Sequence, residues 1–301
     1  MLIVPPAKVL LTGATGFVGS HVLALLRQHG YDVHALVRKP GSVQNATEFV
    51  GSLDQPASIE RAAAGCSAAI HLVGIIAEKN GQTFHSVHTL GTINVLNACK
   101  TAGVKRYIHM SALGTRPNAA SAYHQTKWAA EQAVHDSGLA FTIFRPSLIH
   151  GPRGEFTAML KNWSLGKAPP FIFMPFFGEG LLGQSNSFRI QPVHISDVAH
   201  VFVEALAKPA TIGQTYNVAG PTKLTWREML TIASEKFRGR RKIAIGIPAW
   251  YAKLIASLPL PLPFNKDQVL MSQEDNTCDI TPLLKDFPEL KLKDFAATLS
   301  D

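Results

Sequence analysis

The stretch Thr12–Ser20, TGATGFVGS, decides the fold of this chain. It follows the apolar run Lys8–Leu11, KVLL, which is typical of a strand buried on both faces, and it leads into the helical pattern Ser20–Gly30, SHVLALLRQHG. Glycines stand at its second, fifth and eighth positions. Between a strand and a helix, this spacing predicts a loop that binds the pyrophosphate of a dinucleotide at the start of the helix.

Each of the three glycines has a separate physical task in such a loop. Gly13 allows the tight turn out of the strand, and Gly16 lets the backbone approach the pyrophosphate. Gly19 lets the helix pack closely on the strand. A glycine-rich turn without a ligand is the alternative, and the strand–turn–helix context argues against it.

The rest of the first half alternates short apolar runs with amphipathic stretches. The runs predicted as buried strands are 8–13, 32–37, 68–73, 106–111 and 140–145. The stretches predicted as helices are 16–29, 83–101 and 123–136. Repeated strand–helix–strand units predict an α/β Rossmann fold, a doubly wound parallel sheet with helices on both faces.

The pattern changes after His150 and then returns. A stretch rich in Gly, Pro and Phe is followed by a predicted strand at 190–195, a helix at 196–206 and a strand at 214–220. Thr225 and Glu228 form a capping-box signal for a further helix. We therefore assign 1–155 and 189–221 to a dinucleotide-binding domain, and 156–188 and 222–301 to a smaller, mainly helical substrate-binding domain.

Composition limits the class of protein. Hydrophobic residues make up 46% of the 301 residues and charged residues 17%, as in a folded globular protein. The three cysteines lack metal-ligand spacing, so we expect no metal site and no disulfide framework. We find no signal peptide and no unbroken apolar run of roughly 20 residues. These features predict a cytoplasmic protein, with peripheral attachment to the inner face of a membrane as the alternative.

The net charge of +8 does not point to nucleic acid. The one dense basic run, Arg238–Lys242, is short and has no interleaved aromatic residues. We interpret it as a solvated surface, with contact to anionic lipid as the next alternative.

The end of the second predicted strand indicates which dinucleotide binds. Proteins that bind NAD usually place an acidic residue there, on the ribose 2′-hydroxyl. Here Asp32 begins the strand, and Arg38 and Lys39 stand at its end. Cations at this place suit a 2′-phosphate, so NADP(H) is favoured over NAD(H), the alternative being two solvated surface charges.

Tyr123 and Lys127 are the candidate catalytic pair. Their spacing of four, in YHQTK, puts both side chains on one face of the predicted helix. A lysine ammonium beside a phenol is expected to lower the tyrosine pKa, so that the tyrosine can exchange a proton with a substrate oxygen. Lys127 is also expected to hold the nicotinamide ribose. The spacing alone is common, and its position downstream of a phosphate loop gives it weight.

Together, the motifs TGATGFVG, YHQTK, FRPSLIHGP and QPVHISDVA resemble those of the atypical or extended short-chain dehydrogenase/reductase superfamily, which includes NAD-dependent epimerases and dehydratases. Through TYNVAGPTKLTWREML and, more loosely, IPAWYAKLIASLPLP and KDQVLMSQEDN, the chain is similar to the group that resembles the NAD(P)-binding accessory subunit of respiratory complex I. The resemblance covers nearly the whole chain.

The resemblance implies a set of cofactor contacts. They are Gly13, Thr15, Gly16, Phe17 and Val18 in the phosphate loop, Arg38 at the 2′-phosphate, Ser52 and Leu53 at the adenine, Val73 and Gly74 after the fourth strand, Lys127 at the ribose, and Pro146, Ser147 and Leu148 beside the nicotinamide. The family usually has an aspartate where Ser52 stands.

A second departure concerns catalysis. Enzymes of the superfamily usually carry a serine or threonine after the fifth strand, which polarises the substrate carbonyl. In MSALG that position is Ser111 or, in the register we favour slightly, Ala112. Losing such a donor typically costs 10²–10³ in rate.

Three functions follow from these observations. The first is an NADP(H)-dependent oxidoreductase acting on a carbonyl or hydroxyl of an apolar, quinone-like or isoprenoid-like compound. The stretch Ala168–Phe177, with four phenylalanines, could line its cleft or could be ordinary core. The second is a non-catalytic NADPH-binding structural or redox-sensing subunit associated with a respiratory complex. The third is a sugar-nucleotide epimerase or dehydratase, which rests on shared fold alone.

Overall fold

The computed structural model describes residues 2–258 and 262–299. The chain divides into two compact units. The first unit comprises Met1–Pro146, Ile195–Val218 and Ile280–Leu290, and the second comprises Ser147–His194, Ala219–Asp279 and Lys291–Asp301.

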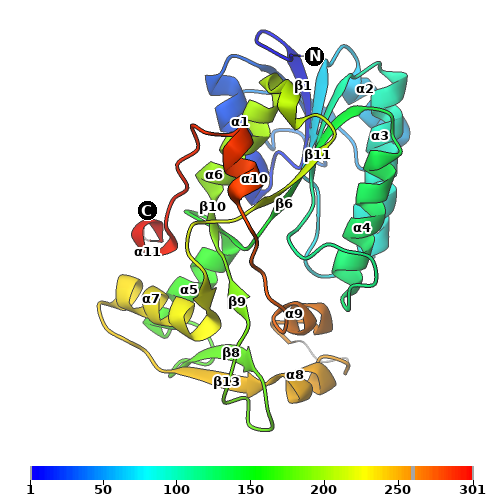
Figure 1. Ribbon diagram of the computed structural model, residues 1–301. Coiled ribbons are helices and arrows are strands. Elements are labelled where there is room, and N and C mark those ends of the chain that lie inside the picture. Colours follow the sequence, from blue (N-terminus) through cyan, green and yellow to red (C-terminus); the bar gives the residue numbers. More distant parts are fainter. Residues whose placement is uncertain (1, 259–261, 300–301) are drawn as a thin grey trace. The chain divides into compact units, whose positions relative to one another are not determined.

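The first unit is built on a seven-stranded sheet in the order β11-β6-β5-β4-β1-β2-β3, and every pair in it is parallel (Figure 1). Its strands are β1 (Lys8–Thr12), β2 (Asp32–Val37), β3 (Thr47–Val50), β4 (Ala68–His71), β5 (Arg106–Met110), β6 (Ala140–Pro146) and β11 (Gln214–Val218). The strand order reverses between β1 and β4, so the carboxyl ends of these two strands flank the switch point where such sheets bind ligands. The α/β Rossmann fold predicted from the sequence is confirmed.

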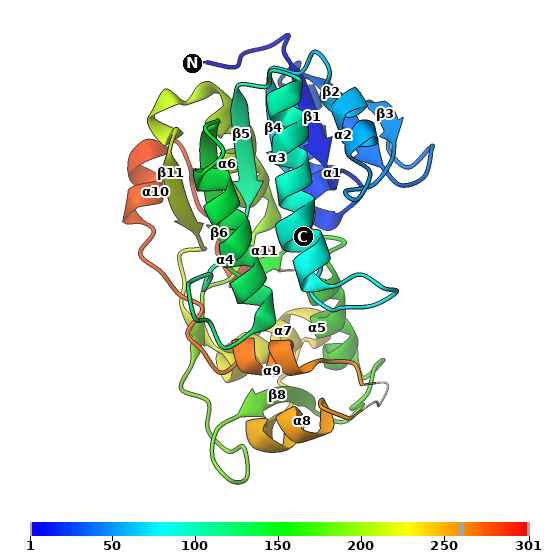
Figure 2. The same cartoon turned by 90° about the vertical axis from the view of Figure 1, so that its right-hand side faces the viewer.

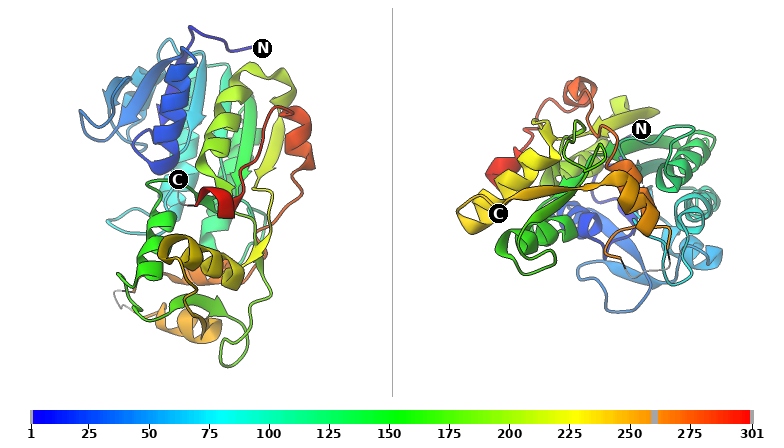
Figure 3. Two further views of the ribbon diagram at one scale, coloured as in Figure 1. Left: turned by 90° about the vertical axis from the view of Figure 1, so that its left-hand side faces the viewer. Right: turned by 90° about the horizontal axis from the view of Figure 1, so that it is seen from below.

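Helices cover both faces of this sheet. On one face lie α2 (Pro56–Ala63), the π-helical turn η1 (His85–Leu90) with α3 (Gly91–Thr101), and α4 (Ala122–His135) (Figure 2). On the other lie α1 (Phe17–Gln28) and α6 (Ile195–Glu204) (Figure 3, left). The short 3₁₀ turns η2 (Ala205–Ala207) and η3 (Pro209–Thr211) follow α6.

Burial on both faces explains why the strands are apolar throughout. Leu10, Ala69 and Ile143 pack against Val95 and Cys99 of α3 in one fully buried cluster. The central strands are therefore packed against helices, as their near-continuous apolar runs predict.

The second unit contains smaller elements. They are β7 (Ile149–His150), α5 (Glu155–Leu165), β8 (Met174–Gly178), β9 (Arg189–Ile190), β10 (Val193–His194), β12 (Leu224–Thr225), α7 (Trp226–Arg238), β13 (Ala244–Pro248), α8 (Ala249–Ile255), α9 (Lys266–Met271) and α11 (Phe295–Thr298). The capping box predicted for Thr225 and Glu228 forms and begins α7. No helix in the described ranges is long and apolar enough to cross a membrane.

The predicted strand 190–195 does not join the main sheet. Its residues form two short strands instead, with β9 paired to β12 and β10 paired to β7. Pro192 lies between them and has no backbone N–H to donate to a ladder, which interrupts a continuous strand. The first unit resumes only at Ile195.

A segment near the C-terminus returns to the first unit, although the sequence pattern placed all of 222–301 in the smaller domain. Helix α10 (Thr281–Asp286) lies against β11, where Asp286 accepts a 2.5 Å hydrogen bond from the hydroxyl of Tyr216. Phe287 is fully buried against Phe144 and Tyr216. Burial of Phe287 and Leu283, together with this hydrogen bond, holds the segment on the first unit.

Candidate functional site

The phosphate loop has the geometry that its glycines predict. Gly13 follows β1 with a φ of +82°, a conformation that favours glycine. A Cβ on Gly19 would lie 1.9 Å from the carbonyl oxygen of Gly13, so only glycine fits where α1 meets the loop. Gly16 caps α1, and no side chain caps this helix end. The start of α1 thus presents backbone to a ligand rather than to a protein side chain.

The three remaining loop residues differ in exposure. Thr15 is exposed, Phe17 is half-buried with its ring edge-on to His21, and Val18 is buried. Thr15 therefore presents its side chain to solvent, while Val18 packs inside.

A cationic pocket opens beside this loop. Thr15, Arg38, Lys39 and Ser42 line an open cavity of about 570 Å³. Arg38 and Lys39 are exposed immediately after β2, and Ser42 donates a 2.5 Å hydrogen bond to the carbonyl oxygen of Lys39. The pocket thus places the phosphate loop next to two cations, and its binding of a 2′-phosphate stays a prediction.

The residues assigned to the adenine lie after β3. Ser52 donates a hydrogen bond to the carboxylate of Asp54, which stands two residues beyond the place where the family usually has its acid. Leu53 packs against the sheet core, and its carbonyl oxygen accepts from the Asn94 side chain at 2.8 Å. Asp54 and Asn94 were not among the site residues predicted from the sequence, because neither belongs to one of its motifs.

Val73 and Gly74 connect the phosphate loop to the catalytic candidates. A Cβ on Gly13 would meet Val73 at 3.3 Å, and a Cβ on Gly74 would meet Nζ of Lys127 at 3.1 Å. Gly74 is exposed. The carboxyl ends of β1 and β4 and the buried side of α4 thus converge on one place in the first unit.

Tyr123 lies in the first turn of α4, which is capped by Ser121. Its half-buried ring packs edge-on against His88, with centroids 5.2 Å apart, and against Phe84 at 5.8 Å. Burial raises the pKa of Tyr123 to about 12. The sequence argument expected Lys127 to lower this pKa, and that direction is wrong here because removal of the phenol from water dominates.

Lys127 is buried four residues further along α4. Its Nζ donates a 3.0 Å hydrogen bond to the carbonyl oxygen of Met110, the last residue of β5. Burial lowers the pKa of Lys127 to about 8, although the nearby carboxylate of Glu131 acts in the opposite direction. Glu131 is itself buried and accepts two hydrogen bonds from the guanidinium of Arg145. This ion pair connects α4, one turn after Lys127, to β6.

The two candidates for the catalytic serine follow β5 directly. Ser111 is buried, and its hydroxyl donates to Oγ1 of Thr115 at 3.3 Å. Oγ1 of Thr115 in turn lies 3.5 Å from Nδ1 of His124. Ala112 is half-buried. Ser111 thus stands at the start of a short polar chain that the sequence argument did not identify, even though His124 belongs to the YHQTK motif.

Comparison with known proteins now gives the family. The model of the NAD dependent epimerase/dehydratase family matches residues 9–219. The chain belongs to this family. Its match takes in the phosphate loop, both cations after β2 and the Tyr123–Lys127 pair.

Two curated relatives show the range of proteins that this family member resembles. It is 28% identical over 281 residues to the NADH dehydrogenase [ubiquinone] 1 alpha subcomplex subunit 9 of Arabidopsis thaliana mitochondria, covering 85% of this chain and 67% of that protein. It is 32% identical over 206 residues to the ceramide reductase of Caulobacter vibrioides, covering 67% of this chain and 61% of that protein.

Solved structures share the fold of this epimerase/dehydratase family member. The UDP-glucose 4-epimerase of Thermotoga maritima matches with a TM-score of 0.75 at 19% identity, covering 97% of this chain and 96% of that one. The UDP-glucose 4-epimerase of Thermus thermophilus in complex with NAD matches with a TM-score of 0.73 at 22% identity, with the same coverage of 97% and 96%.

His88 is a site residue that the sequence argument missed. The backbone N–H of Ile75 donates to its Nε2 at 3.1 Å, and its Nδ1 lies 3.0 Å from Oγ1 of Thr126. Nε2 also lies 3.1 Å from the carbonyl oxygen of Ile75, so the Ile75 backbone and the Thr126 side chain fix the orientation of the ring. Burial, with Lys127 nearby, holds the pKa of His88 far below its ordinary value. The neutral imidazole ring of His88 therefore packs beside the ring of Tyr123.

The loop assigned to the nicotinamide crosses the boundary between the units. Pro146 ends β6 in the first unit, and its carbonyl oxygen accepts from the backbone N–H of Leu113 at 2.8 Å. Ser147 and Leu148 begin the second unit, where the Ser147 hydroxyl donates to the side chain of Asn276. The contact of these three residues with a nicotinamide stays a prediction.

The phenylalanine-rich stretch divides between core and surface. Met174 and Phe176 are buried in the core of the second unit with Leu160 of α5. Phe171 and its neighbour Ile172 are exposed. Part of the stretch is therefore ordinary core, and the place of the remainder in a substrate cleft stays a prediction.

Proposed function

We propose that this epimerase/dehydratase family member is an NADP(H)-dependent oxidoreductase that reduces the carbonyl group of an apolar small molecule. The observation that carries the proposal is the position of Lys127. Its ammonium is buried on α4, one turn after Tyr123, and lies next to Gly74 at the end of β4. The same region holds the phosphate loop, so one site offers both cofactor contacts and a proton donor.

The pocket after β2 supports NADPH over NADH. Arg38 and Lys39 carry the positive charge there, and Thr15 and Ser42 add hydroxyl groups. A phosphate with two negative charges gains charge-assisted hydrogen bonds from such a set. The acidic residue that would select a free 2′-hydroxyl is missing from the end of β2.

The protonation state of Tyr123 is compatible with reduction of a carbonyl group. When bound, the nicotinamide supplies the hydride. Burial raises the pKa of Tyr123, so its hydroxyl carries a proton at neutral pH that it can donate. The substrate oxygen becomes more basic as the carbonyl is reduced, and it then accepts this proton. Lys127 is proposed to hold the nicotinamide ribose, and the Ser111 hydroxyl is proposed to orient the carbonyl oxygen.

The names of relatives support the reductase assignment and an apolar substrate. Besides the ceramide reductase, the NAD(P)H azoreductase of Xenophilus azovorans is 26% identical over 233 residues.

The second candidate is an NADPH-binding subunit without turnover. It is favoured by the likeness to the complex I subunits and by the contact between Lys127 and Met110, which occupies the ammonium within the protein. In that case NADPH would bind with the same preference over NADH, and no acceptor would be reduced.

The two candidates separate in a turnover assay. NADPH oxidation is followed against a panel of quinones and apolar ketones, for the wild type, for Tyr123→Phe and for Tyr251→Phe, whose tyrosine is exposed on α8. We expect turnover that falls at least 10²-fold in Tyr123→Phe alone, the scale of a lost general acid. Tight NADPH binding without turnover for any acceptor would favour the subunit.

A further inference from the structure

The two-stranded sheet formed by β8 and β13 in the second unit has one buried and one open side. In β8 and β13, Met174, Phe176 and Ala244 point into the unit's core. Because side chains alternate along a strand, Ile243 and Ile245 belong to the opposite side. Both are exposed. The turn before β8 adds Phe171 and Ile172, of which Ile172 is 81% exposed.

A second apolar group lies at the other end of the same sheet. Helix α8 covers Ile247 with Ala249 and Ala252 and turns Trp250, Tyr251 and Leu254 outward. The indole N–H of Trp250 donates to the carbonyl oxygen of Leu181 at 3.1 Å, which ties the turn at 180–183 to the helix. Leu181 and Leu182 on this turn are 75% and 73% exposed. Seen from below, β13 crosses this side of the second unit and ends at α8 (Figure 3, right). We call this surface the β13 face; its apolar residues are Phe171, Ile172, Leu181, Leu182, Ile243, Ile245, Trp250, Tyr251 and Leu254.

The chain segment that runs through β13 into α8 is rich in basic residues. Residues 236–253 contain six Lys or Arg residues and no Asp or Glu. Within the described part of the chain, no carboxylate forms an ion pair with Arg238 or Arg240, whereas Arg241 pairs with Glu235. Arg238 and Arg240 therefore place positive charge beside the exposed apolar surface, and no ion pair within the described residues neutralises either of them.

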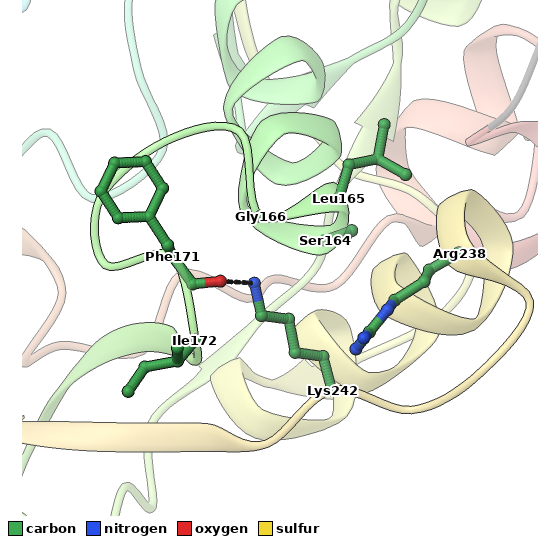
Figure 4. A pocket seen from close by; sticks show the side chains of 7 residues that line it. All are labelled: Ser164, Leu165, Gly166, Phe171, Ile172, Arg238 and Lys242. Carbon is green, nitrogen blue, oxygen red and sulfur yellow. Dashed lines mark hydrogen bonds between the residues drawn. The ribbon is translucent and has the colours of Figure 1, made fainter.

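A pocket of about 390 Å³ lies at the start of β13 (Figure 4). Arg238 and Lys242 line it beside Phe171 and Ile172; Arg238 is exposed, whereas Lys242 is only 8% exposed. Nζ of Lys242 donates to the carbonyl oxygen of Phe171 at 2.7 Å, which holds the apolar turn next to the cations. The Lys242 ammonium also donates to the carbonyl oxygen of Trp163, so the exposed Arg238 guanidinium is the group on this concave surface that suits an anion such as a phosphate group.

We propose that the β13 face binds the surface of a membrane that contains anionic lipids. A lipid phosphate group occupies the pocket at Arg238 and Lys242, and Ile172, Leu181 and Leu182 enter the interface between headgroups and acyl chains. Trp250 and Tyr251 stand beside them, and such amphipathic rings favour the headgroup level.

The shape and charge of the β13 face favour a lipid surface over a protein. Its most exposed apolar side chains stand on turns, at 171–172 and 180–183, and would need matching holes in a rigid partner. A fluid monolayer accepts them without such holes. Residues 236–253 carry only positive charge, so a self-complementary contact of this segment with a second copy of the chain would bring like charges together.

Vesicle binding tests this proposal without reference to catalysis. The whole protein is sedimented with vesicles of phosphatidylcholine alone and with vesicles containing roughly one-third phosphatidylglycerol. We expect binding only to the anionic vesicles, and weaker binding at high salt. Arg238→Gln/Arg240→Gln should weaken it roughly 25-fold, since each basic residue near an anionic surface contributes about fivefold. Leu181→Asp/Leu182→Asp should abolish it.

A control and a spectroscopic signature complete the test. Lys100→Gln/Lys291→Gln removes two exposed cations outside the β13 face and should bind as the wild type does. Vesicles should shift the tryptophan emission to shorter wavelength in the wild type and not in Trp250→Phe. Equal binding to neutral and anionic vesicles, an equal loss in the control, or no binding at all would overturn the proposal. So would a concentration-dependent dimer that Leu181→Asp/Leu182→Asp dissociates.

Discussion

Gly74 and Lys127 lie so close that a side chain on the glycine would touch the ammonium: a Cβ there would stand 3.1 Å from Nζ. The same Cβ would be 3.5 Å from Nε2 of His88. Gly74, three residues after β4, therefore lets the backbone pass close to the buried ammonium because it carries no side chain.

Gly74→Ala tests this relationship. The added methyl group must displace Nζ by a few tenths of an ångström, and it lies in the space that we assign to the ribose. We expect the dissociation constant for NADPH to rise roughly tenfold, on the order of 1.4 kcal/mol, with little change in melting temperature. Titration calorimetry gives the constant. Unchanged NADPH affinity would place the ribose elsewhere.

Lys127→Met should change how stability depends on pH. Burial lowers the pKa of Lys127 to about 8 from an ordinary value of 10.5, so between these pH values the unfolded chain binds this proton and the folded chain does not. Stability conferred by this group therefore rises with pH in that window. The stability of the wild type relative to Lys127→Met should increase by up to about 3 kcal/mol from pH 8 to pH 10.5.

Denaturant unfolding at several pH values measures this difference. Lys100→Met, at an exposed position, should show no such trend. A difference between wild type and Lys127→Met that stays constant over the window would mean that the lysine keeps an ordinary pKa in the folded chain.

Arg38→Ala should reduce the selectivity for NADPH. The arginine lines the pocket after β2 and is expected to contact the 2′-phosphate, which NADH lacks. A lost charge-assisted hydrogen bond costs about 1.5–3 kcal/mol, so NADPH affinity should fall roughly 10- to 100-fold while NADH affinity stays the same. Arg61→Ala, an exposed arginine on α2, is the control. Equal wild-type affinity for the two cofactors would refute the NADP(H) assignment.

Ser111→Ala and Ala112→Ser decide which position supplies the hydroxyl group. We expect Ser111→Ala to lower turnover by 10²–10³, as for a lost oxyanion donor, with NADPH affinity unchanged. Ala112→Ser should have no effect. The reverse result, in which Ala112→Ser raises turnover and Ser111→Ala is silent, would move the role to residue 112.

Local signals in the sequence were sufficient for most of the first unit. The glycine spacing from Gly13 to Gly19 predicted a turn that only glycines permit, and the structure has it. Strands β1, β2, β4, β5 and β6 were recognisable because burial on both faces makes them apolar throughout. The capping box of α7 needs only two side chains three residues apart, and it was also found.

Features that depend on distant parts of the chain were missed. His88 belongs to the site only because Ile75 and Thr126 bind its ring. The return of Phe287 to the first unit depends on its contact with Phe144, far away in the sequence. The pKa of Tyr123 changes in the opposite direction from the prediction because burial, which spacing alone does not reveal, exceeds the effect of a neighbouring charge.

Transfer of deuterium from NADPH labelled at C4 tests the central claim most directly. The wild-type protein is mixed with NADPH deuterated at C4 and an apolar ketone or quinone. We expect a reduced product and one equivalent of NADP⁺. For a ketone, the product should carry the deuterium on carbon. Tyr123→Phe should bind the labelled NADPH as tightly as the wild type and form product at least 10²-fold more slowly. Formation of labelled product at the wild-type rate by Tyr123→Phe would contradict the account.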